Sequence, residues 1–74
     1  MSPVAKEHLL KALLDVRKSD ASNLSFEFAF TTGLYCAYFR AGLINAAEMM
    51  ISADLLQNAR TYRAKEIRNA SEYS

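Results

Sequence analysis

Residues 24–41 read LSFEFAFTTGLYCAYFRA, and this stretch decides the fold of the chain. From Leu24 to Phe30, large apolar residues alternate with small or polar ones, a pattern that is also typical of a half-buried strand. A lone strand is not stable without a partner strand, and no other part of the sequence alternates in this way. We therefore predict a helix over residues 25–41. A strand that pairs with its copy in a dimer, as in a ribbon-helix-helix protein, is the alternative.

A second helix is predicted before this stretch, over residues 3–18. Ser2 is a suitable N-cap, and Pro3 suits the first helical turn because its missing N–H has no partner there. Residues 19–23, which read SDASN, are turn and cap formers and are predicted to form a short linker. Within residues 3–18, apolar residues recur at three- and four-residue spacings, which predicts one buried side of the helix. These residues are Leu9, Leu10, Leu13, Leu14 and Val16.

The most specific local signal follows Gly42, which stands where helices commonly end in a left-handed residue. Asn45 and Glu48 have the spacing of a capping box, and Ile44 with Met49 has the spacing of a hydrophobic staple. These signals predict a third helix over residues 46–68. Its apolar side is predicted to consist of Ile51, Leu55, Leu56, Ala59 and Tyr62.

Together these segments predict an all-α fold, a three-helix small domain over residues 1–74 with a frayed polar tail at residues 69–74. A chain of 74 residues buries only about 60 % of its unfolded surface, and such folds usually need a disulfide, a metal or a second copy. Cys36 is the only cysteine and His8 the only histidine, so an internal disulfide and the usual zinc ligand set are excluded. We therefore predict a homodimer, in the form of a dimeric helical bundle.

A row of small residues is the candidate seam of this dimer. If residues 25–41 are helical, the row follows one side of the helix and lets another backbone approach closely. Two interpretations remain open: the row seats a neighbouring helix within the monomer, or it contacts a second copy. The members of the row stand four positions apart: Ala29, Gly33, Ala37 and Ala41.

No arrangement of residues in the sequence predicts catalysis. Nucleophilic attack by Cys36 would need a base, and His8 lies on the predicted polar side of the first helix. Glu48 and Asp54 stand six positions apart and point to different sides of a helix. The sequence contains no glycine-rich phosphate loop and no paired-histidine motif. We expect a non-enzymatic protein without catalytic residues, cofactor or metal.

The surplus of large apolar residues predicts a protein-binding function. Aromatic residues, methionine and arginine are enriched at protein interfaces, so we expect an adaptor, inhibitor or regulator that binds a larger protein. Short chains of this kind are common among bacterial and phage regulators, which is an expectation from base rates alone. The alternative is that these residues complete a tight monomeric core. The candidate partner-binding patch is Tyr35, Tyr38, Phe39, Arg40, Met49 and Met50.

The basic end of the third helix supports an alternative function, that of a nucleic-acid-associated transcriptional regulator. Although the net charge is only +1, residues 55–74 contain four basic and two acidic residues. Basic residues are also common in the last turns of a helix, where they interact favourably with its macrodipole. This structural role is the preferred interpretation of the basic residues. The candidate phosphate contacts are Arg60, Arg63, Lys65 and Arg68.

The amino-terminal residues and the longest uncharged run bear on location. Residues 1–7 contain no apolar segment typical of a secretory signal. The uncharged run over residues 28–39 is shorter than the roughly 20 residues that a membrane-spanning helix needs. We therefore expect a cytoplasmic protein. Because the helix predicted over residues 25–41 has no lysine-rich polar face, we do not expect it to bind membranes.

Overall fold

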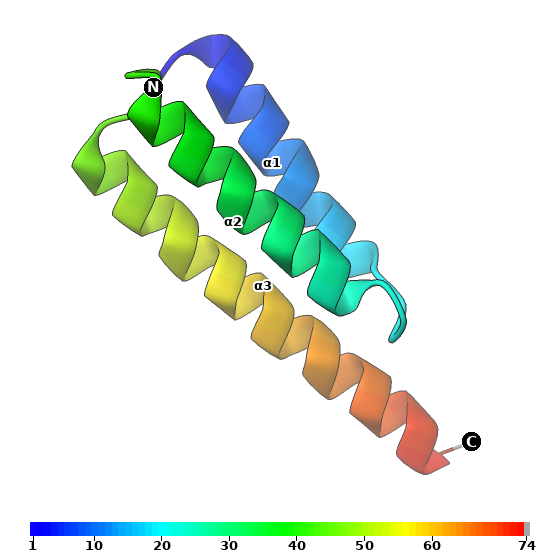
Figure 1. The fold of residues 1–74 in the computed structure, drawn as a ribbon. Helices are drawn as coiled ribbons and strands as arrows, with labels where there is room; N and C mark the ends of the chain where they lie inside the picture. Colours follow the sequence, from blue (N-terminus) through cyan, green and yellow to red (C-terminus); the bar gives the residue numbers. More distant parts are fainter. Residues whose placement is uncertain (74) are drawn as a thin grey trace.

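The computed structural model describes residues 1–73, which form three helices: α1 (Pro3–Lys18), α2 (Leu24–Arg40) and α3 (Ala46–Tyr73). The helices alternate in direction, so α1 and α3 run parallel to each other and antiparallel to α2 (Figure 1). Each helix packs against the other two, and together they form a rod of 45 × 17 × 17 Å. The prediction of an all-α three-helix domain is confirmed.

The segment with the ambiguous pattern is helical throughout. Leu24 and Phe28 pack against the core, whereas Phe26 and Phe30 on the opposite side are 66 % and 54 % exposed. The alternation of residues 24–30 therefore arises from a helix that has apolar residues on both its inner and its outer side. The preferred helix is confirmed, and the strand of the ribbon-helix-helix alternative is wrong.

The predicted caps of α1 and α3 are present. The Ser2 hydroxyl accepts a hydrogen bond from the Ala5 N–H at 3.2 Å. At the start of α3, the Asn45 side chain accepts from the Glu48 N–H at 2.8 Å, and the Glu48 carboxylate accepts from the Asn45 N–H at 2.9 Å. These reciprocal bonds satisfy two backbone donors that have no partner within the helix. The start of α3 is thus fixed by its local sequence.

The turn between α2 and α3 depends on Gly42, whose φ angle is +77°. The Gly42 N–H donates to the Phe39 carbonyl at 3.1 Å, and the Leu43 N–H donates to the Tyr38 carbonyl at 2.9 Å. This pair of bonds is the Schellman motif, which requires a left-handed residue that glycine adopts without steric strain. The buried Ile44 follows and belongs to the core cluster against which Met49 packs, an arrangement consistent with the predicted hydrophobic staple.

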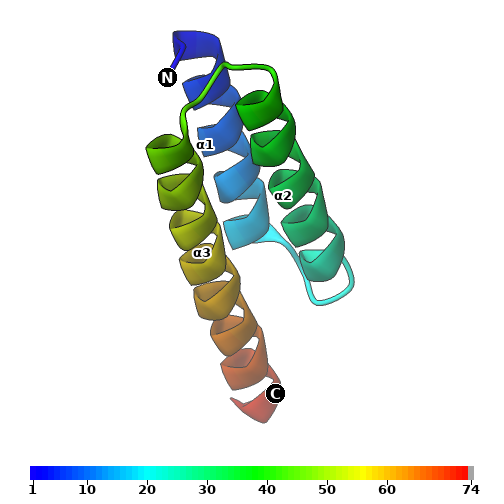
Figure 2. The same ribbon diagram turned by 60° about the vertical axis from the view of Figure 1, so that its left-hand side comes forward.

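The carboxyl end of α3 lies beyond its predicted position. The helix continues from residue 68 to Tyr73, through most of the predicted frayed tail, and residue 74 lies outside the described residues. Residues 69–73 contain neither glycine nor proline, so no local signal stops the helix at residue 68. As a result, the end of α3 projects past the loop that joins α1 and α2 (Figure 2).

Small residues occupy much of the core. Ala5 and Leu9 form one cluster with Ile44, and Val16 forms another with Leu56 and Ala59. Ala12 of α1 and the polar residues Ser19, Thr31 and Ser52 are also buried. The Thr31 and Ser52 hydroxyls donate to the carbonyls of Glu27 and Glu48 in their own helices, so burial leaves neither hydroxyl unsatisfied.

The predicted apolar sides of α1 and α3 are only partly correct. Ala5 and Ala12 are buried in α1 although the prediction omits them, and Leu10 and Leu14 are exposed. In α3, Leu56 and Ala59 are buried as predicted, but three other members of the predicted side are exposed: Ile51, Leu55 and Tyr62. The apolar stripe of each helix is wider than the strip that two neighbouring helices cover, and the remainder faces the solvent.

Candidate protein-binding surfaces

The six residues of the predicted partner-binding patch differ in their exposure to solvent. Tyr35 and Tyr38 are half-buried and pack against the core, as does Met49. Phe39, Arg40 and Met50 are exposed. Three of the six residues are therefore accessible to a partner, as a surface patch requires. The other three pack against the core, as in the alternative interpretation.

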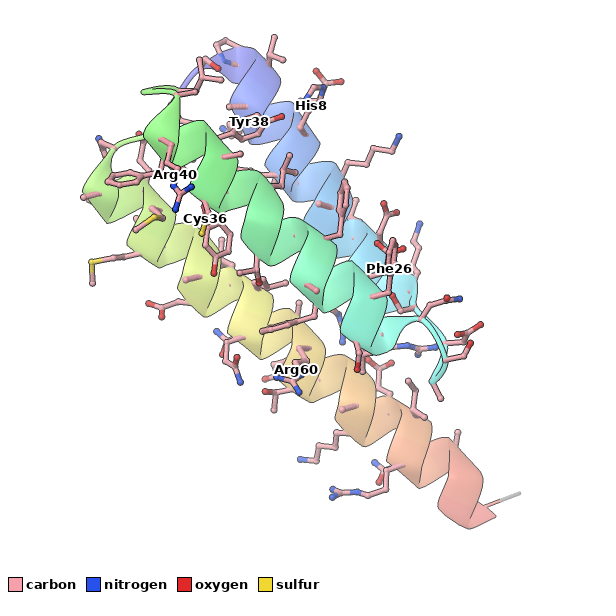
Figure 3. All side chains as sticks on the ribbon, viewed as in Figure 1. His8, Phe26, Cys36, Tyr38, Arg40 and Arg60 are labelled. Carbon is pink, nitrogen blue, oxygen red and sulfur yellow. The ribbon has the colours of Figure 1, made fainter. Side chains whose placement is uncertain are left out.

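Tyr38 is also engaged by α1. Its hydroxyl is hydrogen-bonded to Nδ1 of His8 at 2.6 Å, and the two rings stack with their centroids 6.3 Å apart (Figure 3). Cys36 lies on the side of α2 that faces α3, away from His8 (Figure 3). Sequence reasoning placed His8 among solvated side chains and missed this contact, because it joins residues 30 positions apart. The His8 imidazole thus serves the contact between α1 and α2 and is not positioned beside the thiol.

The predicted row of small residues lies on the solvent side of α2. A Cβ atom placed on Gly33 would meet no other group within 4 Å. Ala29, Ala37 and Ala41 are exposed as well, so the row does not seat α1 or α3. The exposed residues of this side are called the outer face of α2: Phe26, Ala29, Phe30, Gly33, Ala37 and Arg40.

A second apolar surface lies between α1 and α3. Leu10, Leu13, Ile51 and Leu55 line a hollow of about 400 Å³, and Leu14 is exposed one turn after Leu10. These five residues are called the α1–α3 groove. Sequence reasoning assigned all but Leu13 wrongly to a buried side, and it did not identify the groove. The signal that could have revealed it is the presence of small residues, such as Ala5 and Ala12, beside the leucines, because small residues suit the closest part of a helix contact.

Glu48 lies at the edge of the α1–α3 groove and carries a stabilised negative charge. Its Oε2 atom is 2.6 Å from the amino-terminal nitrogen of Met1. The hydrogen bond from this ammonium group, followed by that from the Asn45 N–H, holds the pKa of Glu48 below its ordinary value of 4.5. The amino terminus is thereby joined to α3 at one end of the groove.

Asp20 has a similar role in the linker between α1 and α2. Its carboxylate accepts hydrogen bonds from the Ser22 hydroxyl at 2.7 Å and from the Asn23 N–H at 3.0 Å. These bonds hold the pKa of Asp20 below its ordinary value of 3.8. The carboxylate thus fixes the turn from which α2 begins.

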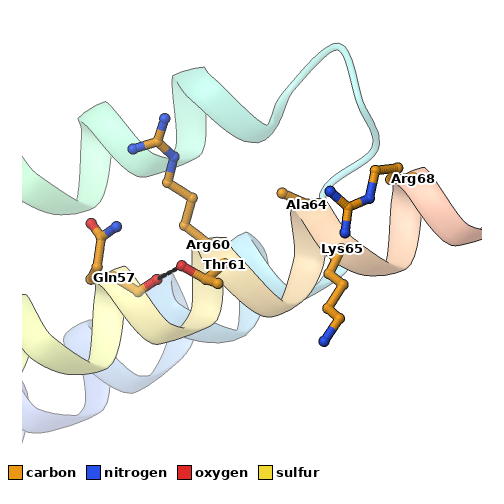
Figure 4. A pocket seen from close by; sticks show the side chains of 6 residues that line it. All are labelled: Gln57, Arg60, Thr61, Ala64, Lys65 and Arg68. Carbon is orange, nitrogen blue, oxygen red and sulfur yellow. Dashed lines mark hydrogen bonds between the residues drawn. The ribbon is translucent and has the colours of Figure 1, made fainter.

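The four predicted phosphate contacts separate into two groups. Arg63 points toward α1, where its Nε donates to the Ser19 carbonyl and its guanidinium lies 3.9 Å from Glu66. Glu66 also pairs with Arg17 at 2.6 Å. The other three basic residues line one side of α3 together with Gln57, Thr61 and Ala64 (Figure 4): Arg60, Lys65 and Arg68. We call these three the basic face of α3.

One member of the basic face has a further contact. The Arg60 guanidinium lies 4.5 Å from the ring centroid of Phe28, in a cation–π arrangement with α2. All residues that line this part of the surface belong to a single helix, so the basic face is an open surface and not a cleft between elements. Such a surface suits an extended anion better than an enclosed small molecule.

The fold and these surfaces define a three-helix protein with two exposed apolar surfaces. Within residues 1–73, no group of three histidine, cysteine or acidic side chains is arranged to hold a metal ion. None of the helices described combines the length and the hydrophobicity that crossing a bilayer requires. Comparison of the chain with protein-family models, curated proteins and solved structures finds no match. The exposed surfaces are therefore the features of the chain from which a function is inferred.

Proposed function

We propose that the protein is a non-enzymatic adaptor or regulator that binds an amphipathic helix of a larger protein in the α1–α3 groove. The observation that supports this proposal is the solvent exposure of large aliphatic side chains along the groove. Leu10 is 50 % exposed, Ile51 58 % and Leu55 48 %. Complete burial of such a side chain contributes about 1.5–3 kcal/mol relative to full exposure, so covering the three half-exposed residues is favourable.

A helix is the ligand that best fits the shape of the groove. Leu10 and Leu14 stand one turn apart on α1, and Ile51 and Leu55 stand one turn apart on α3. These two rows flank a trough between neighbouring parallel helices, which accepts the apolar side of a third helix. A partner helix in this position completes a four-helix bundle with α1, α2 and α3. We expect its apolar residues to recur at i, i+3, i+4 and i+7.

The test is affinity capture with wild-type protein, Ile51→Asp and a matched control, Val4→Asp. Val4 is 61 % exposed on α1 and does not line the groove, so both variants replace an apolar surface residue with a charge. We expect the wild type and Val4→Asp to recover the same protein and Ile51→Asp to lose it. Circular dichroism checks that both variants remain helical.

The recovered protein then has to contain the expected ligand. Synthetic peptides that cover its sequence should bind through one amphipathic helical segment, with an affinity that Ile51→Asp lowers at least tenfold. Equal capture by all three proteins, or binding through an extended segment, would contradict the proposal.

We also propose that the protein acts as a homodimer in the cytoplasm. The support is the small core of a 74-residue chain, which a second copy would enlarge by covering exposed apolar side chains. The α1–α3 groove remains open for the partner protein in such a dimer if self-association uses a different surface.

A second candidate function is supported by the basic face of α3. Glu66 pairs with Arg17 and is not among the residues that line the surface formed by Arg60, Lys65 and Arg68. The phosphates of a nucleic acid could therefore contact three basic side chains on the basic face of α3. The test uses Lys65→Gln with Arg68→Gln, since both side chains are exposed. Binding to nucleic acid that weakens steeply with salt, and that this double variant reduces, would favour this function over protein binding.

A further inference from the structure

We propose that the outer face of α2 pairs with the same face of a second copy in antiparallel orientation, with the two Gly33 residues facing each other at the two-fold axis. This inference rests on the self-association proposed above and adds its surface and its geometry. In a two-fold dimer the same patch occurs on both sides of the interface, so the patch must be complementary to itself.

The distribution of large and small residues along the outer face provides this complementarity. The amino-terminal half presents Phe26 and Phe30, whereas the carboxyl-terminal half presents Ala37, with Ala41 next to it. An antiparallel pair centred on Gly33 places Phe30 of each copy beside Ala37 of the other, and Phe26 at the end of the face beside Arg40. A parallel pair would place phenylalanine against phenylalanine and alanine against alanine, which leaves space unfilled along half of the contact.

Gly33 itself is explained by a second copy and not by the monomer. It lies within α2 and its φ angle is not positive, so its own backbone conformation does not require glycine. No group lies within 4 Å of the position of a Cβ atom, so packing within the chain does not require glycine either. Glycine costs about 1 kcal/mol relative to alanine inside a helix. The close approach of a second helix backbone at this position would offset that cost.

The ends of the outer face also match each other. Phe26 and Arg40 lie toward opposite ends of α2 (Figure 3), seven positions on either side of Gly33. An antiparallel pair therefore places each Arg40 beside Phe26 of the second copy, where a cation–π contact forms. Arg60 makes the same type of contact with Phe28 within the chain. Arg40 is the only charged residue of the outer face and lies at its end, so the centre of the interface contains no charge.

The exposed area of the chain is consistent with one covered surface per copy. A compact monomer of 8.3 kDa exposes about 4,600 Å², whereas this chain exposes 5184 Å². The chain therefore exposes roughly 600 Å² more than a compact chain of its mass, and Phe26 and Phe30 of the outer face are among its exposed apolar residues. A standard interface covers about 800 Å² per partner. The α1–α3 groove is concave, and two such grooves placed face to face would leave the space between them unfilled. The outer face of α2 is therefore the surface that a second copy covers.

The test is size-exclusion chromatography coupled to light scattering, with wild type, Gly33→Glu and Asn58→Glu. Gly33→Glu is tolerated by the monomer because its surroundings are open, but it would bring two carboxylates together at the two-fold axis. Asn58→Glu adds the same charge at an exposed position of α3. We expect the wild type and Asn58→Glu near 17 kDa, twice the chain mass of 8.3 kDa, and Gly33→Glu at the monomer mass with unchanged helicity.

The orientation is tested by cross-linking in a Cys36→Ser background. Ala29→Cys and Ala37→Cys place thiols on the outer face, and a short thiol-specific cross-linker should join the two proteins when they are mixed but not either protein alone. Cross-linking of each protein to itself would indicate a parallel pair and overturn the proposal. A monomeric wild type, or a Gly33→Glu protein that remains dimeric, would overturn it as well.

The two surfaces can be tested separately. Ile51→Asp should abolish capture of the partner protein and leave the mass near 17 kDa, whereas Gly33→Glu should halve the mass and leave capture unchanged. A third result is possible: the wild type is monomeric, and Gly33→Glu no longer captures the partner protein. In that case the outer face of α2 binds the partner protein, and the dimer proposal is wrong.

Discussion

The hydroxyl of Tyr38 on α2 is hydrogen-bonded to Nδ1 of His8 on α1, with 2.6 Å between the two atoms. At the other end of α1, Arg63 of α3 donates to the carbonyl of Ser19. α1 is therefore joined by polar contacts to α2 near one end and to α3 near the other, and apolar packing joins the helices between these ends. These contacts, the helix caps and the two glycines lead to four predictions.

Replacing Tyr38 with phenylalanine should lower the free energy of unfolding by about 0.5–1 kcal/mol, because a partly exposed hydrogen bond is lost and water can replace it. Tyr62→Phe is the control, since it removes the hydroxyl of an exposed tyrosine. Urea denaturation followed by circular dichroism measures both variants. Equal losses for Tyr38→Phe and Tyr62→Phe would show that the contact with His8 has no energetic role.

Replacing Asn45 with alanine should lower the free energy of unfolding by about 1 kcal/mol, since the Glu48 N–H loses its capping acceptor. Asn45→Asp keeps an acceptor at the same position and should retain most of the stability. Asn58→Ala, at an exposed position within α3, should be neutral or slightly stabilising because alanine has the higher helix propensity. The same urea titration compares the three variants.

Acid should weaken the fold through Glu48. Its pKa in the folded chain lies below the ordinary value of 4.5, so the ionised carboxylate stabilises the folded state above that value. This contribution is lost as the pH falls through the folded pKa, when the carboxylate is protonated. Glu48→Gln keeps a capping side chain without the charge, and its stability should change less between pH 7 and pH 3. Parallel pH profiles of wild type and Glu48→Gln, measured by urea denaturation, would contradict this prediction.

The two glycines should respond to alanine in opposite directions. Gly42→Ala should destabilise the chain by about 1–2 kcal/mol, because a φ angle of +77° is strained for a residue with a Cβ atom. Gly33→Ala should stabilise the dilute monomer by up to about 1 kcal/mol, because alanine favours the helix and its Cβ meets open space. Thermal unfolding at low protein concentration measures both changes. A loss of stability in Gly33→Ala at this concentration would contradict the open surroundings of Gly33 in the monomer.

Local features of the fold could be predicted from the sequence because nearby residues determine them. The capping box of Asn45 and Glu48 and the turn at Gly42 depend on residues within five positions of each other. The pattern of residues 24–30 does not by itself distinguish a helix from a strand, since apolar residues on both sides of a helix give the same alternation as a half-buried strand. The predicted end of α3 at residue 68 is too early. Residues 69–73 contain neither glycine nor proline, so the sequence does not mark the position where the helix ends.

The candidate surfaces were predictable only in part. The row of small residues that contains Gly33 could be read from its spacing, but its exposure depends on where α1 and α3 pack. The α1–α3 groove was missed because a helical period gives the direction of an apolar stripe and not which part of it the neighbouring helices cover. Leu10 and Ile51 therefore seemed equivalent to Leu9 and Leu56 until the neighbours of each residue were known.

The contact between Arg63 and Ser19 joins parts of the chain that are far apart in the sequence, so it forms only after both have been made. Arg63 is made 44 residues after Ser19, and Leu56 and Ala59, which cover Val16, are also made late. Without α3, α1 and α2 can meet each other but leave Val16 without the side chains that cover it in the complete bundle.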